Sequence, residues 1–286
     1  MLLLQFAGWS SAVDPSFWHK IAELKLNRMH LSEKEIECES EFHMSRNDGV
    51  DVPMFVNGGN VFADADDANG AYGGKNDKND GIIGCWRARG DTMNFNVKER
   101  LFEMKPNEEA KRIGQDLLDA MKTMDADVVV NRLNTFRVFM HADLKKWKFF
   151  YWFFFPSVMF APYEFVEKRS GDEEETLCGN ENAKSRAECM KSWLDKPQSA
   201  FAWCVETVRK ENSTYVSSNH ALSKFMELCK DVTLKEGGTD RTLEICFVDT
   251  ATGDAPSISL LNVLTFLDVR FQRTKPIDVA CIRANN

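Results

Sequence analysis

The chain has 286 residues, of which 43% are hydrophobic and 28% are charged, with a formal net charge of −8 at pH 7. This composition is typical of a globular protein, and a chain of this length buries about three quarters of its unfolded surface, in one domain or two lobes. The acidic balance argues against broad binding to nucleic-acid phosphates. The apolar start 1–4 has no basic segment and stops at Gln5, which predicts neither a signal peptide nor a membrane anchor.

Helices and strands are predicted to alternate along the chain, which indicates an α/β fold, with α+β as the alternative. Helices are predicted over 14–27, where Asp14 caps and Pro15 opens the helix, and over 106–121, 183–194 and 257–271. A further helix is predicted to begin at a Ser217 or Ser218 cap and to carry Leu222, Phe225 and Cys229. Strands are predicted over 2–7, 132–141, 147–155, 201–208, 243–248 and 277–282.

The segment 57–81 is dominated by Asn, Asp and Gly, and it predicts a mobile insert because it cannot bury apolar surface. Asp64 and Asp66 have the spacing of a calcium loop. Ala68 stands at the next ligand position and Lys75 at the position of the bidentate glutamate. The segment therefore does not predict a calcium site.

The run 147–155 holds eight aromatic residues in nine positions. In a strand, alternate side chains point to opposite faces, and both faces of this run are apolar after Lys148. That pattern is typical of an interior strand. We therefore expect a central mixed sheet with a buried aromatic strand near 147–155, flanked by helices.

The sequence Ala-Asp-Leu-Lys-Lys at 142–146, followed by these aromatics, resembles the N-terminal domain of the autophagy ubiquitin-like-modifier-activating enzymes (autophagy-related protein seven). The opening of the chain, including Phe17-Trp18-His19, is similar to the start of that family. Cys246-Phe247-Val248-Asp249, followed by Asn262, resembles its last strand and helix, and 84–95 loosely resembles one of its turns. The resemblance runs in the same order along most of the chain, 1–286.

Motifs for common catalytic sites are absent from the sequence. It contains no G-x-G-x-x-G, no G-x-x-x-x-G-K-[ST], no G-x-S-x-G and no C-x-x-C. The eight cysteines, in a large chain without a secretion signal, favour reduced thiols in the cytoplasm over disulfides. A cysteine-dependent enzyme, with His141 near one of the strand cysteines, stays open as an alternative, as does a general interaction scaffold. No catalytic, cofactor-binding or metal-binding residue is assigned.

The resemblance implies a non-catalytic docking role. In that family the ATP-binding loop and the thioester-forming cysteine belong to a second domain, which we do not expect within this chain. The N-terminal domain captures the conjugating enzymes, autophagy-related proteins three and ten, through a flexible segment that folds as a helix in a groove. The modifier, such as autophagy-related protein eight or twelve, contacts the other domain. The resemblance further implies a monomer with no cofactor and no membrane insertion.

Arginines and aromatics are favoured in interface cores, and lysines form a local positive patch on this acidic chain. The candidate partner-binding residues are Trp86, Arg87, Arg89, Lys145, Lys146 and Lys148. Phe17, Trp18, Phe149, Tyr151 and Trp152 are expected in the core.

One stretch departs from the family. Many members carry Gly-Trp-Pro-Leu-Arg-Asn before the last helix, and here only Leu260 and Asn262 match it. If that motif shapes a partner surface, the partner contacts differ here. If it caps the helix, Pro256 and Ser257 replace it.

Overall fold

The computed structural model describes residues 2–8, 11–43, 54–62, 85–159, 162–165, 180–194, 201–210, 214–233, 241–249, 251, 255–271 and 277–282. These residues form an α/β fold with a six-stranded, a four-stranded and a two-stranded sheet. The predicted fold class is therefore confirmed. The Asp64–Lys75 region and most of the predicted insert lie outside the described residues, but 57–62 belong to a strand, so the predicted start of the insert was wrong.

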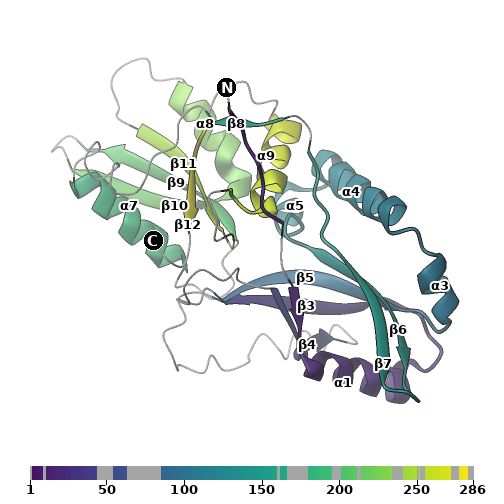
Figure 1. Ribbon diagram of the computed structural model, residues 1–286. Helices are drawn as coiled ribbons and strands as arrows, with labels where there is room; N and C mark the ends of the chain where they lie inside the picture. Colours follow the sequence, from purple (N-terminus) through teal and green to yellow (C-terminus); the bar gives the residue numbers. More distant parts are fainter. Residues whose placement is uncertain are drawn as a thin grey trace.

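The six-stranded sheet is mixed, with the strand order β2-β4-β3-β5-β6-β7 (Figure 1). Its strands are β2 (Ser11–Val13), β3 (Ile36–His43), β4 (Met54–Phe62), β5 (Cys85–Asn94), β6 (Phe136–Asp143) and β7 (Lys148–Phe154). β5 runs parallel to β6, and β7 returns antiparallel to β6 as the second strand of a hairpin.

Helix α1 (Pro15–Leu24) covers one face of this sheet and continues into a π-helical turn, η1 (Lys25–Met29). The Asp14 carboxylate accepts a hydrogen bond from the Ser16 N–H at 2.8 Å, which confirms the predicted cap. Phe17 and Ile21 are fully buried beneath the helix. The helix lies so close to β4 that a Cβ at Gly58 would come within 2.4 Å of the Ser16 carbonyl oxygen.

The predicted central position of the aromatic strand is wrong, because among the described residues β7 pairs with β6 alone and lies at the edge of its sheet. Tyr151 and Trp152, expected in the core, are 45% and 42% exposed, whereas Phe17 is buried. The side chains of β7 instead stack on one another and on helices that cover only part of each face. The apolar residues on both faces of 147–155 are therefore explained by an edge strand whose two faces are each partly covered by helices.

The four-stranded sheet has the order β10-β9-β11-β12, with β9 (Ala202–Arg209), β10 (Tyr215–Ala221), β11 (Arg241–Val248) and β12 (Asp278–Ile282). It packs with α7 (Asn180–Leu194) and α8 (Phe225–Thr233), and Trp203 is fully buried. Ser217 and Ser218 lie inside β10 and do not cap a helix, which corrects that prediction. The helix that follows begins after a 3₁₀ turn, η2 (Leu222–Lys224).

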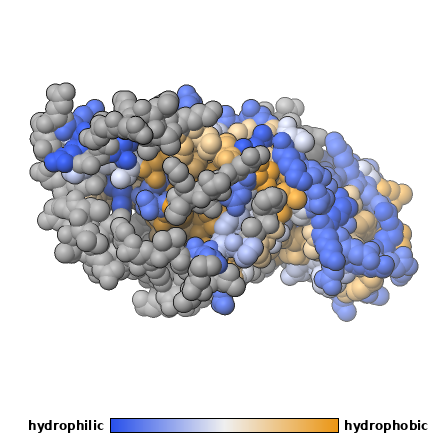
Figure 2. Space-filling model, turned by 90° about the horizontal axis from the view of Figure 1, so that it is seen from above, coloured by the Kyte–Doolittle hydropathy of each residue, from blue (hydrophilic) through white to orange (hydrophobic). Residues whose placement is uncertain are grey.

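Two helices connect the lobes built on these sheets. They are α4 (Pro106–Thr123), which shows a hydrophilic outer face in Figure 2, and α9 (Ile258–Phe271), whose residues from Ser259 to Leu267 are buried. Short helices α3 (Lys98–Glu103) and α5 (Ala126–Val130) flank α4, and β1 (Leu2–Leu3) pairs with β8 (Glu164–Phe165). One apolar cluster runs from Phe17 through Leu117 to Trp203, so the two lobes share a core.

Candidate partner-binding surface

The turn and outer strand of the β6–β7 hairpin carry the largest group of exposed aromatic side chains in the described part of the chain. Trp147, Tyr151 and Trp152 are 49%, 45% and 42% exposed, and Phe149 and Phe150 are half-buried between them. We call these five residues the aromatic edge. Large aromatics that remain exposed on a folded protein are typical of binding surfaces.

One face of the aromatic edge rests on α1. The ring of Trp18 stacks on that of Phe149 with 4.9 Å between centroids and lies 4.9 Å from that of Tyr151. His19 approaches Trp147 at 4.9 Å. Trp147 has a φ of 52°, a left-handed conformation that strains a residue with a bulky side chain. The turn thus holds its indole against α1 at a conformational cost.

The other face of the aromatic edge meets α3. Phe102, which is 55% exposed, packs edge-on against Phe150 with 5.6 Å between ring centroids. The Lys98 ammonium lies 4.0 Å from the Phe150 ring centroid and 5.0 Å from that of Phe102. This cation–π arrangement places a positive charge on an aromatic surface.

Three of the predicted binding residues lie at the turn end of this hairpin. Lys145, Lys146 and Lys148 are exposed, and Lys146 is 3.9 Å from the carboxylate of Asp143. Together with Lys98 they make the aromatic edge basic, whereas the whole chain is acidic.

The other three predicted residues lie elsewhere. Trp86, Arg87 and Arg89 belong to β5, before the point where Gly90 pairs with Phe136, while the lysines lie beyond Asp143 at the other end of β6. The eight residues of β6 separate these ends, and their seven intervals correspond to about 23 Å. The Arg89 side chain is exposed, and the side chains of Trp86 and Arg87 lie outside the described residues. The six residues therefore do not form one surface.

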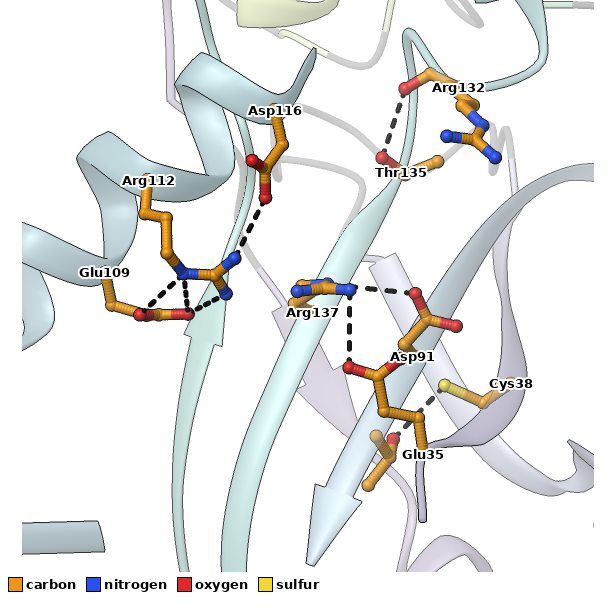
Figure 3. A network of polar contacts seen from close by, with 10 residues as sticks. Glu35, Cys38, Asp91, Glu109, Arg112, Asp116, Arg132, Thr135 and Arg137 are labelled. Carbon is orange, nitrogen blue, oxygen red and sulfur yellow. Dashed lines mark hydrogen bonds and ion pairs between the residues drawn. The ribbon is translucent and has the colours of Figure 1, made fainter. Parts of the chain in front are cut away.

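An ion-pair network lies near the point where Gly90 of β5 pairs with Phe136 of β6. Arg137 of β6 lies 3.3 Å from Glu35 and 3.8 Å from Asp91, and Arg112 of α4 pairs with Glu109 and Asp116 (Figure 3). Burial raises the pKa of Asp91, and the charge of Arg137 opposes that shift. The members of this network already pair with one another, which is the arrangement of a structural network.

The base of the hairpin is fixed by α9. The Asn262 amide donates to the carbonyl oxygens of Leu133 at 2.9 Å and Pro156 at 2.8 Å, and its oxygen accepts from the Val158 N–H at 3.0 Å. Thr265 donates to the Val158 carbonyl at 2.6 Å. These bonds join α9 to the chain just before β6 and just after β7, so they orient the hairpin relative to the second lobe.

The stretch 257–262 is therefore interior. Ser257 is 1% exposed and Asn262 is 3% exposed, so neither presents a partner surface. The Ser257 hydroxyl has no hydrogen-bond partner among the described residues and does not cap α9. Instead the Asp249 carboxylate accepts from the N–H groups of Ser257 at 2.9 Å and Ala251 at 3.1 Å.

Four described cysteines have a raised pKa, which makes them poor nucleophiles. Burial raises the pKa of Cys38 to about 12 and raises those of Cys204, Cys229 and Cys246. Cys189 is half-buried and Cys281 is exposed, while Cys178 and the side chain of Cys85 lie outside the described residues. His141 lies 3.0 Å from the Phe95 carbonyl oxygen, a contact that orients it toward the backbone.

Within the described ranges, no group of three or more His, Cys, Asp or Glu side chains is placed to hold a metal ion. A shallow cavity of about 470 Å³ lies between α7 and β10. Its polar groups pair with each other, as in the 3.2 Å bond between Ser185 and Ser217 and the 3.1 Å bond between Asn219 and Ser192. None of the described helices is long and apolar enough to cross a bilayer.

The family of the chain is shown by its similarity to known proteins. The model described as "Ubiquitin-like modifier-activating enzyme ATG7 N-terminus" matches residues 4–286. The chain belongs to this family. Among curated ATG7 proteins, the one from Dictyostelium discoideum is 25% identical over 293 aligned residues, covering 99% of this chain and 38% of that protein. The one from Homo sapiens is 26% identical over 155 residues, covering 54% of this chain and 20% of that protein. The chain thus spans well under half of these relatives.

Solved structures show the same ATG7 N-terminal fold. The crystal structure of Kluyveromyces marxianus Atg7NTD matches with a TM-score of 0.57 and 18% identity, covering 99% of this chain and 86% of that one. The crystal structure of the K. marxianus Atg7NTD–Atg10 complex matches with a TM-score of 0.57 and 19% identity, covering 99% of this chain and 83% of that one.

Proposed function

We propose that this chain is the docking domain of an autophagy ubiquitin-like-modifier-activating enzyme. It recruits the conjugating enzymes, autophagy-related proteins three and ten, for thioester transfer of modifiers such as autophagy-related proteins eight and twelve. The observation that carries this proposal is the family match over 4–286, supported by a solved relative in complex with Atg10. Tethering raises the local concentration of the conjugating enzyme near the thioester.

We assign activation of the ubiquitin-like modifier to the part of the relatives that lies outside the matched region, since the chain covers 38% of the Dictyostelium protein. Docking needs no cofactor in this chain, and we propose that the domain acts in the cytoplasm as a monomer. The raised pKa of the buried thiols opposes the alternative of a cysteine-dependent enzyme.

The aromatic edge is the surface that best fits this role. Covering the remaining exposed area of Tyr151 or Trp152 would stabilise a complex by about 2 kcal/mol each, from roughly 25 cal/mol per Å² of apolar surface. The exposed lysines contribute about 0–1 kcal/mol each and mainly raise the association rate. The aromatics therefore supply most of the affinity, and the lysines favour an acidic partner.

Titration calorimetry against autophagy-related protein three of the same organism tests the proposal. We expect saturable binding that is lost when the flexible segment of the partner is deleted. Trp152→Ala is expected to weaken binding about thirtyfold, from a loss of about 2 kcal/mol. Val128→Ala is the matched control, because Val128 is 42% exposed on α5. Absence of binding at high micromolar concentration would contradict the docking role and favour a scaffold with other partners.

A further inference from the structure

The turn between β6 and β7 carries a compact group of cationic and aromatic side chains. Lys145, Lys146, Trp147 and Lys148 are consecutive and exposed, and we call them the hairpin tip. Figure 1 shows this turn at the end of the first lobe that points away from the second lobe. We propose that the hairpin tip binds the surface of an anionic lipid bilayer peripherally, without crossing it. This activity goes beyond the docking function and does not depend on it.

The indole of Trp147 is held in a half-exposed position at the bend of the turn. It is 49% exposed, and its ring lies 4.9 Å from the ring of His19 and 5.2 Å, edge-on, from that of Phe149. Tryptophan is enriched where proteins meet the headgroup region of a bilayer, because its ring has an apolar body and a polar N–H. An indole fixed at the end of a hairpin is therefore suited to that region.

The charges of the hairpin tip complement an anionic surface. Its lysines supply three positive charges, and the Asp143 carboxylate, 3.9 Å from the Lys146 ammonium, offsets one of them, so two remain. On the adjoining helix α1, Lys20 and Glu23 pair with each other at 3.3 Å and leave this surplus unchanged. Lysines close to an anionic bilayer favour binding to it.

The net charge of −8 does not oppose this contact at a distance. The Debye length is about 8 Å at physiological ionic strength, so acidic side chains farther from the bilayer are largely screened. The hairpin tip lies beyond the last pair of β6 and β7, Asp143 with Lys148, at the end of the sheet. The local positive charge therefore governs how this end of the molecule meets an anionic surface.

The shape of the hairpin tip distinguishes a bilayer from a protein partner. A hairpin turn is convex, whereas the helix of a conjugating enzyme is expected to lie in a groove. The shallow cavity of the described part of the chain is between α7 and β10, in the other lobe. Lysine side chains can lay their aliphatic stems against apolar surface while the ammonium groups stay among the headgroups. A convex, basic and aromatic turn thus fits a bilayer surface.

Flotation of the intact chain with lipid vesicles tests the proposal, with no conjugating enzyme present. The probe is vesicles of equal parts phosphatidylcholine and phosphatidylserine, and vesicles of phosphatidylcholine alone are the reference. We expect binding to the anionic vesicles that weakens as the salt concentration is raised. Absence of binding to the anionic vesicles, or equal binding to both kinds, would overturn the proposal. That failure would leave the docking function intact, because docking is measured without vesicles.

A pair of charge reversals tests the role of the lysines. Lys145→Glu combined with Lys148→Glu is expected to weaken binding to the anionic vesicles at least about tenfold. Lys111→Glu combined with Lys122→Glu is the matched control, because both lysines are exposed on α4 and the net charge changes by the same amount. Equal loss of vesicle binding in the two double variants would contradict a specific role of the hairpin tip.

A single substitution tests the role of the indole. Trp147→Ala is expected to weaken vesicle binding about tenfold, because it removes the apolar surface that enters the headgroup region. Val216→Ala is the control, because Val216 is 44% exposed on β10, in the other sheet. All variants are first compared with the parent chain by thermal unfolding. Folded tip variants that bind vesicles as well as the parent chain, but lose affinity for the conjugating enzyme, would assign the hairpin tip to a protein partner instead.

Discussion

Replacing Asn262 by alanine removes the buried amide that joins α9 to both ends of the β6–β7 hairpin. The change leaves the carbonyls of Leu133 and Pro156 and the N–H of Val158 without this partner. A buried backbone group left unpaired costs about 1–3 kcal/mol, and partial relaxation lets some of the three find other partners. We therefore expect the free energy of unfolding to fall by about 3–5 kcal/mol, a large part of the stability of a typical domain.

Urea unfolding measures this loss as a shift of the midpoint at constant slope. Asn131→Ala is the control, because the Asn131 amide donates to the Asp127 carbonyl at 3.0 Å on an exposed surface. The control is expected to change stability by no more than about 0.5 kcal/mol. A loss below about 1 kcal/mol for Asn262→Ala would show that these three bonds do not hold the base of the hairpin.

Three further predictions concern stability. Phe17→Ala is expected to destabilise the fold by about 3–5 kcal/mol, because the Phe17 ring is fully buried. Trp152→Ala is expected to destabilise it by less than about 1.5 kcal/mol, because Trp152 is 42% exposed. Equal losses of stability in urea unfolding would contradict this difference. Gly90→Ala is expected to lower the free energy of unfolding by about 1–3 kcal/mol or more, because the added Cβ would lie 2.4 Å from the Phe136 ring. Gly8→Ala is the control and should be neutral, because nothing lies within 4 Å of its Cβ. Thermal unfolding compares the two variants. Burial raises the pKa of the Cys38 thiol from 9.0 to about 12 in the folded state, so its contribution to folding stability is complete below pH 9 and is lost between pH 9 and 12. In that range the stability of the parent chain should fall faster than that of Cys38→Ala, by up to about 1.4 kcal/mol per pH unit. Parallel profiles of stability against pH for the two proteins would refute this prediction.

Local signals in the sequence predicted many elements correctly. The Asp14 cap, Pro15 and the spacing of Phe17 and Ile21 predicted α1, because capping and helical periodicity act within a few residues. Pro106 likewise marked the start of α4, and apolar runs marked β9 and β11. These features depend on neighbours in the chain and are therefore readable from it.

Strand order was not readable in the same way. β7 lies at the edge because β6 pairs with one side of it and no described strand pairs with the other. The residues 147–155 alone do not determine either fact. The sequence predicted a helix cap at Ser217 or Ser218, where the structure has strand β10. The Ser217 hydroxyl forms a 2.9 Å hydrogen bond with the Thr207 hydroxyl on the neighbouring strand, so β10 needs few apolar residues. Polar strands of this kind resemble loops in sequence.

The candidate surface was found in part. The lysines at 145, 146 and 148 and the neighbouring aromatics are adjacent in sequence, so one motif contained them. Phe102 and Lys98 were missed because only the packing of α3 against β7 brings them to Phe150. No observation tests partner binding by the six predicted residues, so it stays a prediction for Trp86, Arg87, Arg89, Lys145, Lys146 and Lys148.

Calorimetric titration of the intact chain with autophagy-related protein three tests the docking role most directly. We predict saturable binding that weakens about thirtyfold in Trp152→Ala and is unchanged in Val128→Ala. No saturable binding at high micromolar concentration would contradict the docking role, and binding equally strong in both variants would contradict the assignment of the aromatic edge.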